Sequence, residues 1–146
     1  MHLKKRLQNR ALCRYTKGMK KSPDEWKKIL TKEQYDVLID KKTEVPFTGD
    51  YLYNEEDGTY DCAACHEPLF ASETKFEAHC GWPSFNNVIS DKAVVLKEDW
   101  SEGMQRVEVI CGNCGGHLGH VFNDAPDQPT GVRFCINSAA LNFKAE

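Results

Sequence analysis

The chain of 146 residues is long enough for one domain with a sizeable hydrophobic core and too short for two independent ones. Its composition is 40% hydrophobic, but no apolar stretch approaches the roughly 18 residues that a membrane-spanning helix needs, so nothing indicates a membrane protein. The formal net charge of -3 is unevenly distributed, because residues 22–146 contain 11 basic residues and all 22 acidic ones, about -11 by formal count. This negative charge disfavours nucleic acid as the main ligand.

Residues 1–21 form a segment of their own, with eight of the 19 basic residues and no acidic one. Too few apolar residues recur at helical spacing for this segment to dock firmly on a core, so we interpret it as a basic flexible tail. An acid-free composition also fits an organelle-targeting segment, although serine is absent from it. Cys13 is interpreted as an exposed thiol without a role.

Two short helices are predicted directly after the tail. Ser22, Pro23 and Glu25 supply an N-cap serine, a proline at the first helical position and a glutamate three residues after the cap, which together satisfy free amide groups at a helix start. Thr31 and Gln34 repeat this signal for a second helix beside the first. The residues expected to face inward are Trp26, Ile29 and Leu30 in the first helix and Tyr35, Leu38 and Ile39 in the second.

After the helices, the pattern is that of strands separated by turns. Prolines and an Asp-Gly pair interrupt the chain at short intervals, as expected at turns. Strands are predicted over residues 93–97, 106–111 and 131–136, which are rich in apolar and β-branched side chains. The predicted class is therefore mainly β, with residues 22–146 as the folded domain.

Four of the seven cysteines form two CxxC pairs, separated by residues 66–110. Two-residue spacing lets both sulfurs of a pair face one ion, and four thiolates in a tetrahedron are a common closed structural zinc site. A redox-active CxxC or two disulfides are the alternatives, but redox pairs usually open a helix in a βαβ setting. Without an apolar signal-peptide core, thiolates in a reducing compartment are favoured, and we expect a cytoplasmic location. The predicted ligands of one structural zinc ion are Cys62, Cys65, Cys111 and Cys114.

Two further cysteines, Cys80 and Cys135, lie outside the CxxC pairs and are the candidates for a reactive thiol. Strand alternation places Arg133, Cys135 and Asn137 on one face, and a guanidinium near a thiol favours the nucleophilic thiolate. A buried structural cysteine is the alternative for Cys135. Cys80 lies in a segment rich in glycine and proline, and a thiol on such a loop can reach a partner.

A histidine pair and two aromatic residues add to the candidate site. His117 and His120 follow the second CxxC pair on a turn that the metal would hold rigid, and imidazoles beside a thiolate can donate protons near neutral pH. Trp82 and Phe85 follow Cys80, where aromatic groups on a loop shape pockets more often than they fill an interior, although core packing is the alternative.

Three ordered blocks resemble the signature of the B-type methionine-R-sulfoxide reductases. These blocks are CGWPSF at 80–85, CGNCGGHLGHVF at 111–122 and RFCINSAAL at 133–141. The resemblance runs from about residue 30 to about residue 143 and leaves the basic tail outside. Two positions depart from the pattern, because His79 and Lys42 stand where glycine or another small residue is usual. The His79 side chain adds bulk next to Cys80, so it could change the rate at which Cys80 forms a disulfide.

The resemblance implies a fold of two antiparallel β-sheets with short N-terminal helices. It implies that Cys135 attacks the sulfoxide, that Cys80 is the resolving cysteine, and that Trp82 forms an apolar wall for the substrate methyl group. It further implies the R epimer in oxidised proteins as substrate and thioredoxin as reductant, and we expect a monomer. The polar side of the pocket would comprise His117, His120, Arg133 and Asn137, and the substrate-binding residues would comprise Trp82, Phe85 and Phe122.

The hypothesis for the reaction follows from these roles. Cys135 attacks the sulfoxide sulfur while His120, assisted by His117, protonates the oxygen, which releases methionine and leaves a sulfenic acid on Cys135. Cys80 then condenses with the sulfenic acid to a disulfide, which requires Cα atoms within about 7 Å. The competing hypothesis is a zinc-ribbon-like module that binds protein or nucleic acid, but ribbons commonly separate their knuckles by roughly 15 to 20 residues.

Overall fold

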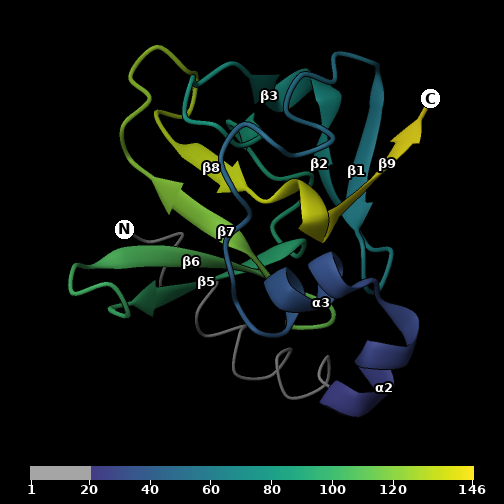
Figure 1. Ribbon diagram of the computed structural model, residues 1–146. Helices are drawn as coiled ribbons and strands as arrows, with labels where there is room; N and C mark the ends of the chain where they lie inside the picture. The colour runs from purple at the N-terminus through teal and green to yellow at the C-terminus, as the bar shows by residue number, and fades with distance from the viewer. Residues whose placement is uncertain (1–20) are drawn as a thin grey trace.

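Two antiparallel sheets and two short helices make up residues 21–146, the part of the chain that the computed structural model describes (Figure 1). The predicted basic tail, with Cys13, lies outside the described residues apart from Lys21. Within residues 21–146, no helix has the length and hydropathy needed to cross a bilayer. The prediction of a mainly β fold with two antiparallel sheets and leading helices is confirmed.

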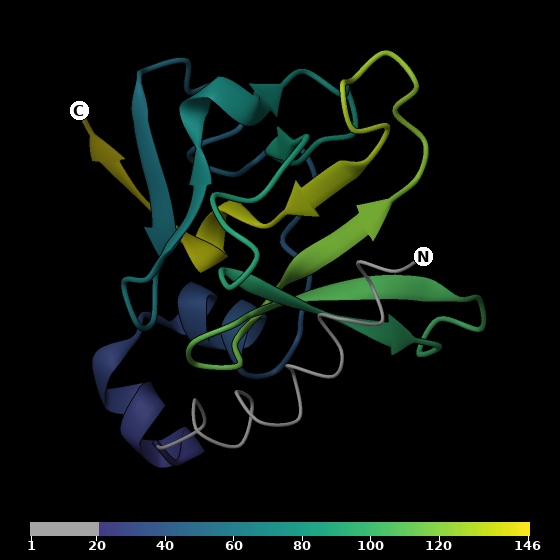
Figure 2. The same ribbon diagram turned by 180° about the vertical axis from the view of Figure 1, so that it is seen from behind.

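The smaller sheet has the strand order β2-β1-β9 and the larger one the order β3-β4-β8-β7-β6-β5, with every neighbouring pair antiparallel (Figure 2). The strands predicted from the sequence correspond to β5, β6 and β8. The elements are α2 Pro23–Ile29, α3 Lys32–Leu38, β1 Gly58–Cys62, β2 Pro68–Ala71, η1 Ser72–Thr74, β3 Lys75–Phe76, β4 Ser84–Phe85, β5 Val94–Asp99, β6 Arg106–Cys111, β7 His117–Phe122, β8 Arg133–Ile136, η2 Ser138–Ala140 and β9 Leu141–Ala145.

Both helices begin at the predicted capping boxes. The Ser22 hydroxyl accepts a hydrogen bond from the backbone N–H of Glu25, whose carboxylate accepts one from the backbone N–H of Ser22. Thr31 and Gln34 make the same two hydrogen bonds at the start of α3. These local interactions fix where each helix starts, independently of the sheets.

Five of the six residues predicted to face inward are at least half-buried, and Val37 is buried in addition. Trp26 and Leu30 are buried and Tyr35 is half-buried, as expected, but Ile29 is 58% exposed. The prediction for Ile29 is wrong because Trp26 and Leu30, four residues apart, already fill the narrow contact face of so short a helix. Leu38 of α3 is buried and packs beside the second CxxC pair, where a side chain at Gly116 would meet it.

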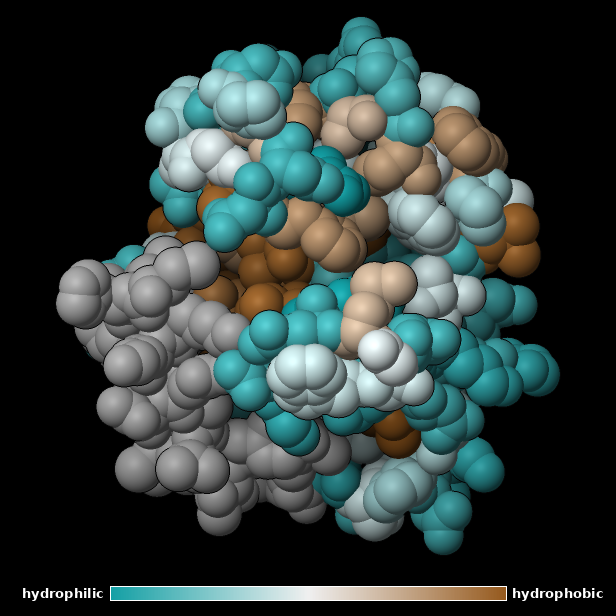
Figure 3. Space-filling view, turned by 90° about the vertical axis from the view of Figure 1, so that its left-hand side faces the viewer, coloured by the Kyte–Doolittle hydropathy of each residue, from teal (hydrophilic) through white to brown (hydrophobic). Residues whose placement is uncertain are grey.

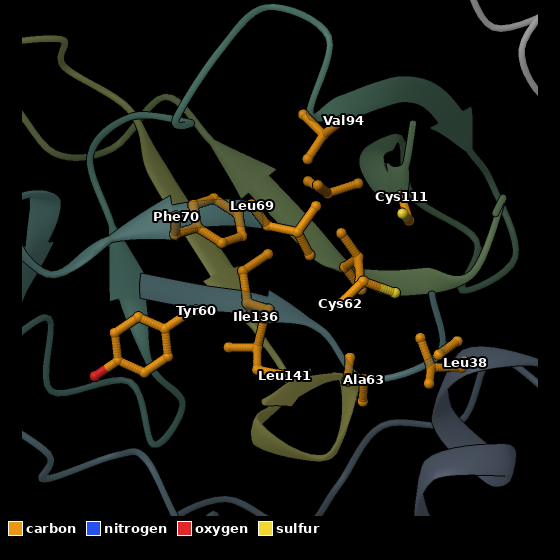
Figure 4. Packing of buried hydrophobic residues seen from close by; sticks show 14 of the residues in the cluster. Leu38, Tyr60, Cys62, Ala63, Leu69, Phe70, Val94, Cys111, Ile136 and Leu141 are labelled. Carbon is orange, nitrogen blue, oxygen red and sulfur yellow. The ribbon is translucent and has the colours of Figure 1, made fainter. Parts of the chain in front are cut away.

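The core lies between the two sheets. Phe70 on β2 stacks on Phe85 of β4 with ring centroids 4.4 Å apart, and Tyr60 of β1 meets Phe85 at 5.2 Å. Figure 4 shows Tyr60, Phe70 and Ile136 gathered in this layer, together with Cys62 at its edge. Because burying one such ring contributes about 1.5–3 kcal/mol, these contacts fasten the smaller sheet to β4 and β8.

Candidate active site

Four cysteine sulfurs meet at one edge of the core, as predicted. All four Sγ atoms, from Cys62, Cys65, Cys111 and Cys114, lie within 4.8 Å of one another. The Cys62–Cys114 and Cys65–Cys111 sulfur separations are 3.7 and 3.6 Å. A tetrahedral ion with metal–sulfur bonds of about 2.3 Å requires sulfurs about 3.8 Å apart. The donor set and its spacing therefore fit one tetrahedral metal ion.

The two CxxC pairs fold into matching turns. The N–H of His66 donates to the carbonyl of Cys62 at 2.8 Å, and the N–H of Gly115 donates to the carbonyl of Cys111 at 3.0 Å. His66 and Gly115 both have positive φ, 67° and 79°, a conformation that glycine adopts freely and histidine only at a cost. Because Cys62 ends β1 and Cys111 ends β6, a bound metal joins the two sheets.

A pocket of about 180 Å³ opens where β7 and β8 meet the chain that leaves α3. In Figure 1 this chain runs from α3 across the front of β7 and β8. The structure brings every predicted catalytic and substrate-binding residue to the pocket except His117 and Phe85. The lining residues are Thr43, Cys80, Trp82, Arg106, Gly119, His120, Phe122, Arg133, Cys135 and Asn137.

The sulfur atoms of Cys80 and Cys135 lie 3.8 Å apart in this pocket. Cys135 is on β8, paired with Ser84 of β4, while Cys80 lies in a tight turn that continues through Gly81 at φ 97°. A disulfide bond is about 2.05 Å long, so these sulfurs need to approach by less than 2 Å. Closure of this bond therefore requires no large loop movement.

The two sulfurs share one proton. The pKa of Cys80 is lowered to about 5, mainly by the hydrogen bond with Cys135 and less by Ser84 and Arg133, against the opposing effect of burial. The same sulfur contact and burial raise the pKa of Cys135, while Arg133 acts to lower it. The pair thus carries one negative charge near neutral pH. The sulfur–sulfur hydrogen bond stabilises this charge, and Arg133 stabilises it on either sulfur.

Alkylation is expected to reveal the shared proton. Because the pKa of Cys80 is about 5, the rate of its reaction with iodoacetamide should change little between pH 6 and 8 and fall below about pH 5. The Cys135→Ala variant loses the hydrogen-bond partner, so its midpoint should move toward the ordinary cysteine pKa of about 8.5. A wild-type rate that rises about tenfold per pH unit between pH 6 and 8 would contradict the shared proton.

Arg133 and His120 are each held by a carboxylate. The Arg133 guanidinium donates to both oxygens of Asp124 at 3.0 and 2.9 Å and lies 4.4 Å over the Phe122 ring. His120 Nε2 is 2.7 Å from Asp99 Oδ2. Sequence patterns missed both carboxylates because each partner lies many residues away or across a turn.

His120 directly faces Cys135 across the β7–β8 pairing. Side chains of directly opposed residues project to the same face of a sheet, so the imidazole and the thiol share the pocket. Burial lowers the pKa of His120, and the charge of Arg106 adds to this effect, whereas the hydrogen bond with Asp99 acts in the opposite direction. A proton on this ring is therefore weakly held and readily transferred.

A family model described as "SelR domain" matches residues 30–145. The peptide methionine sulfoxide reductase MsrB of Methanosarcina barkeri is 60% identical over 89% of this chain and 91% of its own length. The corresponding protein of Leptospira interrogans is 55% identical over 86% of this chain and 95% of its own length. The chain belongs to the B-type methionine sulfoxide reductase family.

A solved structure, the Mis18 "Yippee-like" domain, resembles the B-type chain in fold alone. Its TM-score is 0.50 at 14% sequence identity, with 62% of this chain and 98% of that chain covered. This likeness concerns the arrangement of strands and carries no information on the reaction.

His117 and Phe85 occupy different places in this B-type reductase from those predicted. His117 and His120 lie on β7 rather than on a turn, and a register shift against β6 breaks the alternation, which allows the two rings to lie 5.5 Å apart. His117 is 3% exposed, and its Nδ1 is 2.7 Å from Glu108. It can therefore act on a ligand only through His120. Phe85 is fully buried against Phe70 and belongs to the core, so the geometry gives no support to a substrate-binding role.

Glu44 connects both sides of the pocket in the B-type reductase, and no sequence pattern points to it. Its backbone carbonyl accepts a hydrogen bond from Trp82 Nε1 at 3.0 Å, and its N–H donates to Asn137 Oδ1 at 3.0 Å. Its carboxylate accepts hydrogen bonds from the backbone amides of residues 138 and 139. The side-chain amide of Asn137 also donates a hydrogen bond to the Leu118 carbonyl. Through these hydrogen bonds, Asn137 connects β7, the end of β8 and the segment that contains Glu44.

His79 departs from the B-type pattern at a position with φ 58°. This left-handed conformation explains why a glycine is usual there. The His79 side chain is 85% exposed, and its backbone N–H donates to Glu77 at 2.7 Å. Its bulk therefore points toward solvent and leaves Cys80 accessible to Cys135.

Proposed function

We propose that this protein reduces the R epimer of methionine sulfoxide in polypeptides to methionine, with Cys135 as nucleophile and Cys80 as resolving cysteine. The observation that carries the proposal is the 3.8 Å sulfur pair inside a pocket that also contains His120, in a chain of the B-type family. Trp82 supplies an apolar wall for the substrate methyl group, and Arg133 and His120 supply the polar side. The R preference is supported by the family alone.

The first step needs a nucleophile and an acid on opposite sides of the sulfoxide. Cys135 attacks while the proton shared by the pair resides on Cys80, and His120 delivers a proton to the oxygen. The oxygen is transferred between the two sulfurs: the transient bond from Cys135 to the substrate sulfur and the substrate sulfur–oxygen bond break, a sulfur–oxygen bond to Cys135 forms, methionine leaves, and Cys135 becomes a sulfenic acid. Cys135 is thereby oxidised by two electrons and the sulfoxide is reduced by two.

The second step forms a disulfide, which an external reductant must then return to two thiols. The Cys80 thiol condenses with the sulfenic acid, releases water and forms the Cys80–Cys135 disulfide. A dithiol protein of the thioredoxin type is the proposed reductant of that disulfide, and a cytoplasmic location would provide it. We also propose that the enzyme works as a monomer, since one chain supplies every residue used above.

Zinc is the proposed metal at the four-cysteine cluster. A closed tetrahedral site of four thiolates leaves no open position, so the ion would supply structural cross-linking and no reaction chemistry. A zinc-ribbon-like binding module is not favoured as an alternative function. It accounts for Cys62, Cys65, Cys111 and Cys114 but gives no role to the sulfur pair in the pocket.

An epimer-resolved assay tests the function. The reduced protein is mixed with a blocked methionine sulfoxide peptide of either epimer, and peptide products and free thiols are counted. We expect consumption of the R epimer alone and loss of two thiols per chain in the absence of reductant. Consumption of only the S epimer would refute the stereochemical proposal, and no loss of thiols with either epimer would support a binding module instead.

A further inference from the structure

We propose that residues 45–47 and residues 100–105 form an apolar rim that binds the neighbours of methionine sulfoxide in an extended polypeptide. This inference rests on the proposed function and extends the recognised ligand from one side chain to the residues on either side of it. The name apolar rim is used below for these two segments. Its four large exposed side chains are Val45, Phe47, Trp100 and Met104.

Exposed apolar side chains concentrate at the apolar rim. Among residues 21–146, seven large hydrophobic side chains are exposed, and four of them, at 59–67% exposure, lie on these two short segments. A single exposed hydrophobic residue is ordinary on a protein surface. A group of them beside a pocket is typical of a binding surface. Figure 3, viewed from the side toward which the β5–β6 hairpin projects, shows apolar patches set in a largely hydrophilic surface.

The first segment of the rim lies along the turn that carries Cys80. The N–H of Phe47 donates to the carbonyl of Gly81 at 2.8 Å. A side chain at Gly81 would touch both Pro46 and the ring of Phe47. Thr43, just before this segment, lines the pocket itself. Val45 and Phe47 are therefore beside the pocket entrance and not on a remote surface.

Phe47 keeps a conformation that its burial does not explain. Its φ is 66°, in the left-handed region that is unfavourable for residues other than glycine. Phe47 remains 59% exposed, so little core packing offsets this strain. Strained backbone conformations of this kind cluster at active sites and ligand-binding segments.

The second segment lies on the acid side of the pocket. Residues 100–105 join β5 to β6, and the pair at the base of this loop is Asp99 with Arg106. Asp99 binds His120, and Arg106 lines the pocket. Trp100 and Met104 lie on the loop that this pair closes, within two residues of Asp99 and Arg106.

The geometry favours a polypeptide as the occupant of the rim. The pocket of about 180 Å³ accommodates one side chain of the size of methionine sulfoxide, so the adjoining residues of a peptide must lie on its borders. The first border, residues 45–47, has no charged side chain, and the second offers Trp100 and Met104 beside one charged residue, Glu102. Apolar neighbours, which are exposed when a damaged protein unfolds, should therefore bind better than glycine neighbours.

Steady-state kinetics on two blocked tripeptides test the proposal, with dithiothreitol as the only reductant. One peptide carries Gly on both sides of R-methionine sulfoxide and the other carries Phe and Leu. We expect wild-type kcat/KM to be about tenfold higher for the Phe/Leu peptide, with the difference in KM. The double variant Val45→Thr, Phe47→Asn should lose this preference and keep its rate on the Gly peptide, because asparagine tolerates positive φ.

Controls separate the possible outcomes. Ile29→Thr removes an equally exposed side chain on α2 and should leave both peptides unaffected. Equal wild-type kcat/KM for both peptides, or an unchanged preference in the double variant, would overturn the proposal while leaving sulfoxide reduction intact. A double variant impaired only with thioredoxin as reductant would assign this surface to the reductant and likewise overturn it. No turnover of either peptide by wild-type enzyme would instead refute the proposed function.

Discussion

Replacing Cys135 by serine is expected to abolish the first turnover, lowering the rate by about 10⁴-fold or more. Serine keeps the shape of the side chain, but its hydroxyl is a far weaker nucleophile than a thiolate at neutral pH. The measurement is single-turnover formation of methionine peptide, with enzyme in excess over an R-methionine sulfoxide peptide and no reductant present.

Cys80→Ser is the matched control for this experiment. It should complete one turnover and then stop when thioredoxin is the reductant, because the sulfenic acid has no partner for a disulfide. The comparison is sharp because the two sulfurs lie 3.8 Å apart in the same pocket, so geometry gives both access to the substrate. If Cys135→Ser completed a full turnover and Cys80→Ser did not, Cys80 would be the nucleophile and the assigned order of the two sulfurs would be reversed.

Removing the metal with a strong chelator is expected to unfold the domain. The four-cysteine cluster connects β1 of the smaller sheet with β6 of the larger one. Structural zinc contributes roughly 10–16 kcal/mol in small domains, as much as or more than the roughly 5–15 kcal/mol that separate most native states from unfolded ones. Far-UV and near-UV circular dichroism should both lose their native signals, and metal analysis should find about one zinc per chain before treatment.

A variant series distinguishes unfolding from simple loss of activity. Cys114→Ser should be poorly folded without any chelator, whereas Cys80→Ser, which removes a sulfur outside the cluster, should keep its circular dichroism spectrum. Added zinc should restore the chelated wild type. A metal-free protein that remained fully folded would contradict the structural role of the cluster.

Local signals in the sequence were sufficient for the elements that depend on neighbouring residues. The capping boxes at Ser22 and Thr31 appear in the structure as predicted, because each is complete within four residues. The two CxxC pairs also meet as predicted, since four thiolates have few other stable arrangements. Strand alternation likewise places Cys135 and Arg133 together at the pocket.

The remaining features depend on contacts between distant segments. Glu44 lies in a stretch without regular structure, and only its hydrogen bonds to Trp82 and Asn137 reveal its position. The burial of Phe85 follows from stacking on Phe70 in the other sheet, which no local pattern records. The register shift in β7 depends on its pairing with β6, so the common orientation of the two histidines could not be derived from their spacing.

The short separation between the two sulfurs also bears on how long the enzyme survives under oxidative stress. A sulfenic acid that waits for a distant partner can meet a second molecule of peroxide and become a sulfinic acid, which ordinary thiols do not repair. Here the partner sulfur already lies 3.8 Å away. In the proposed reaction, overoxidation would compete with an immediate neighbour, which would protect the catalyst from permanent inactivation under the very conditions that create its substrate.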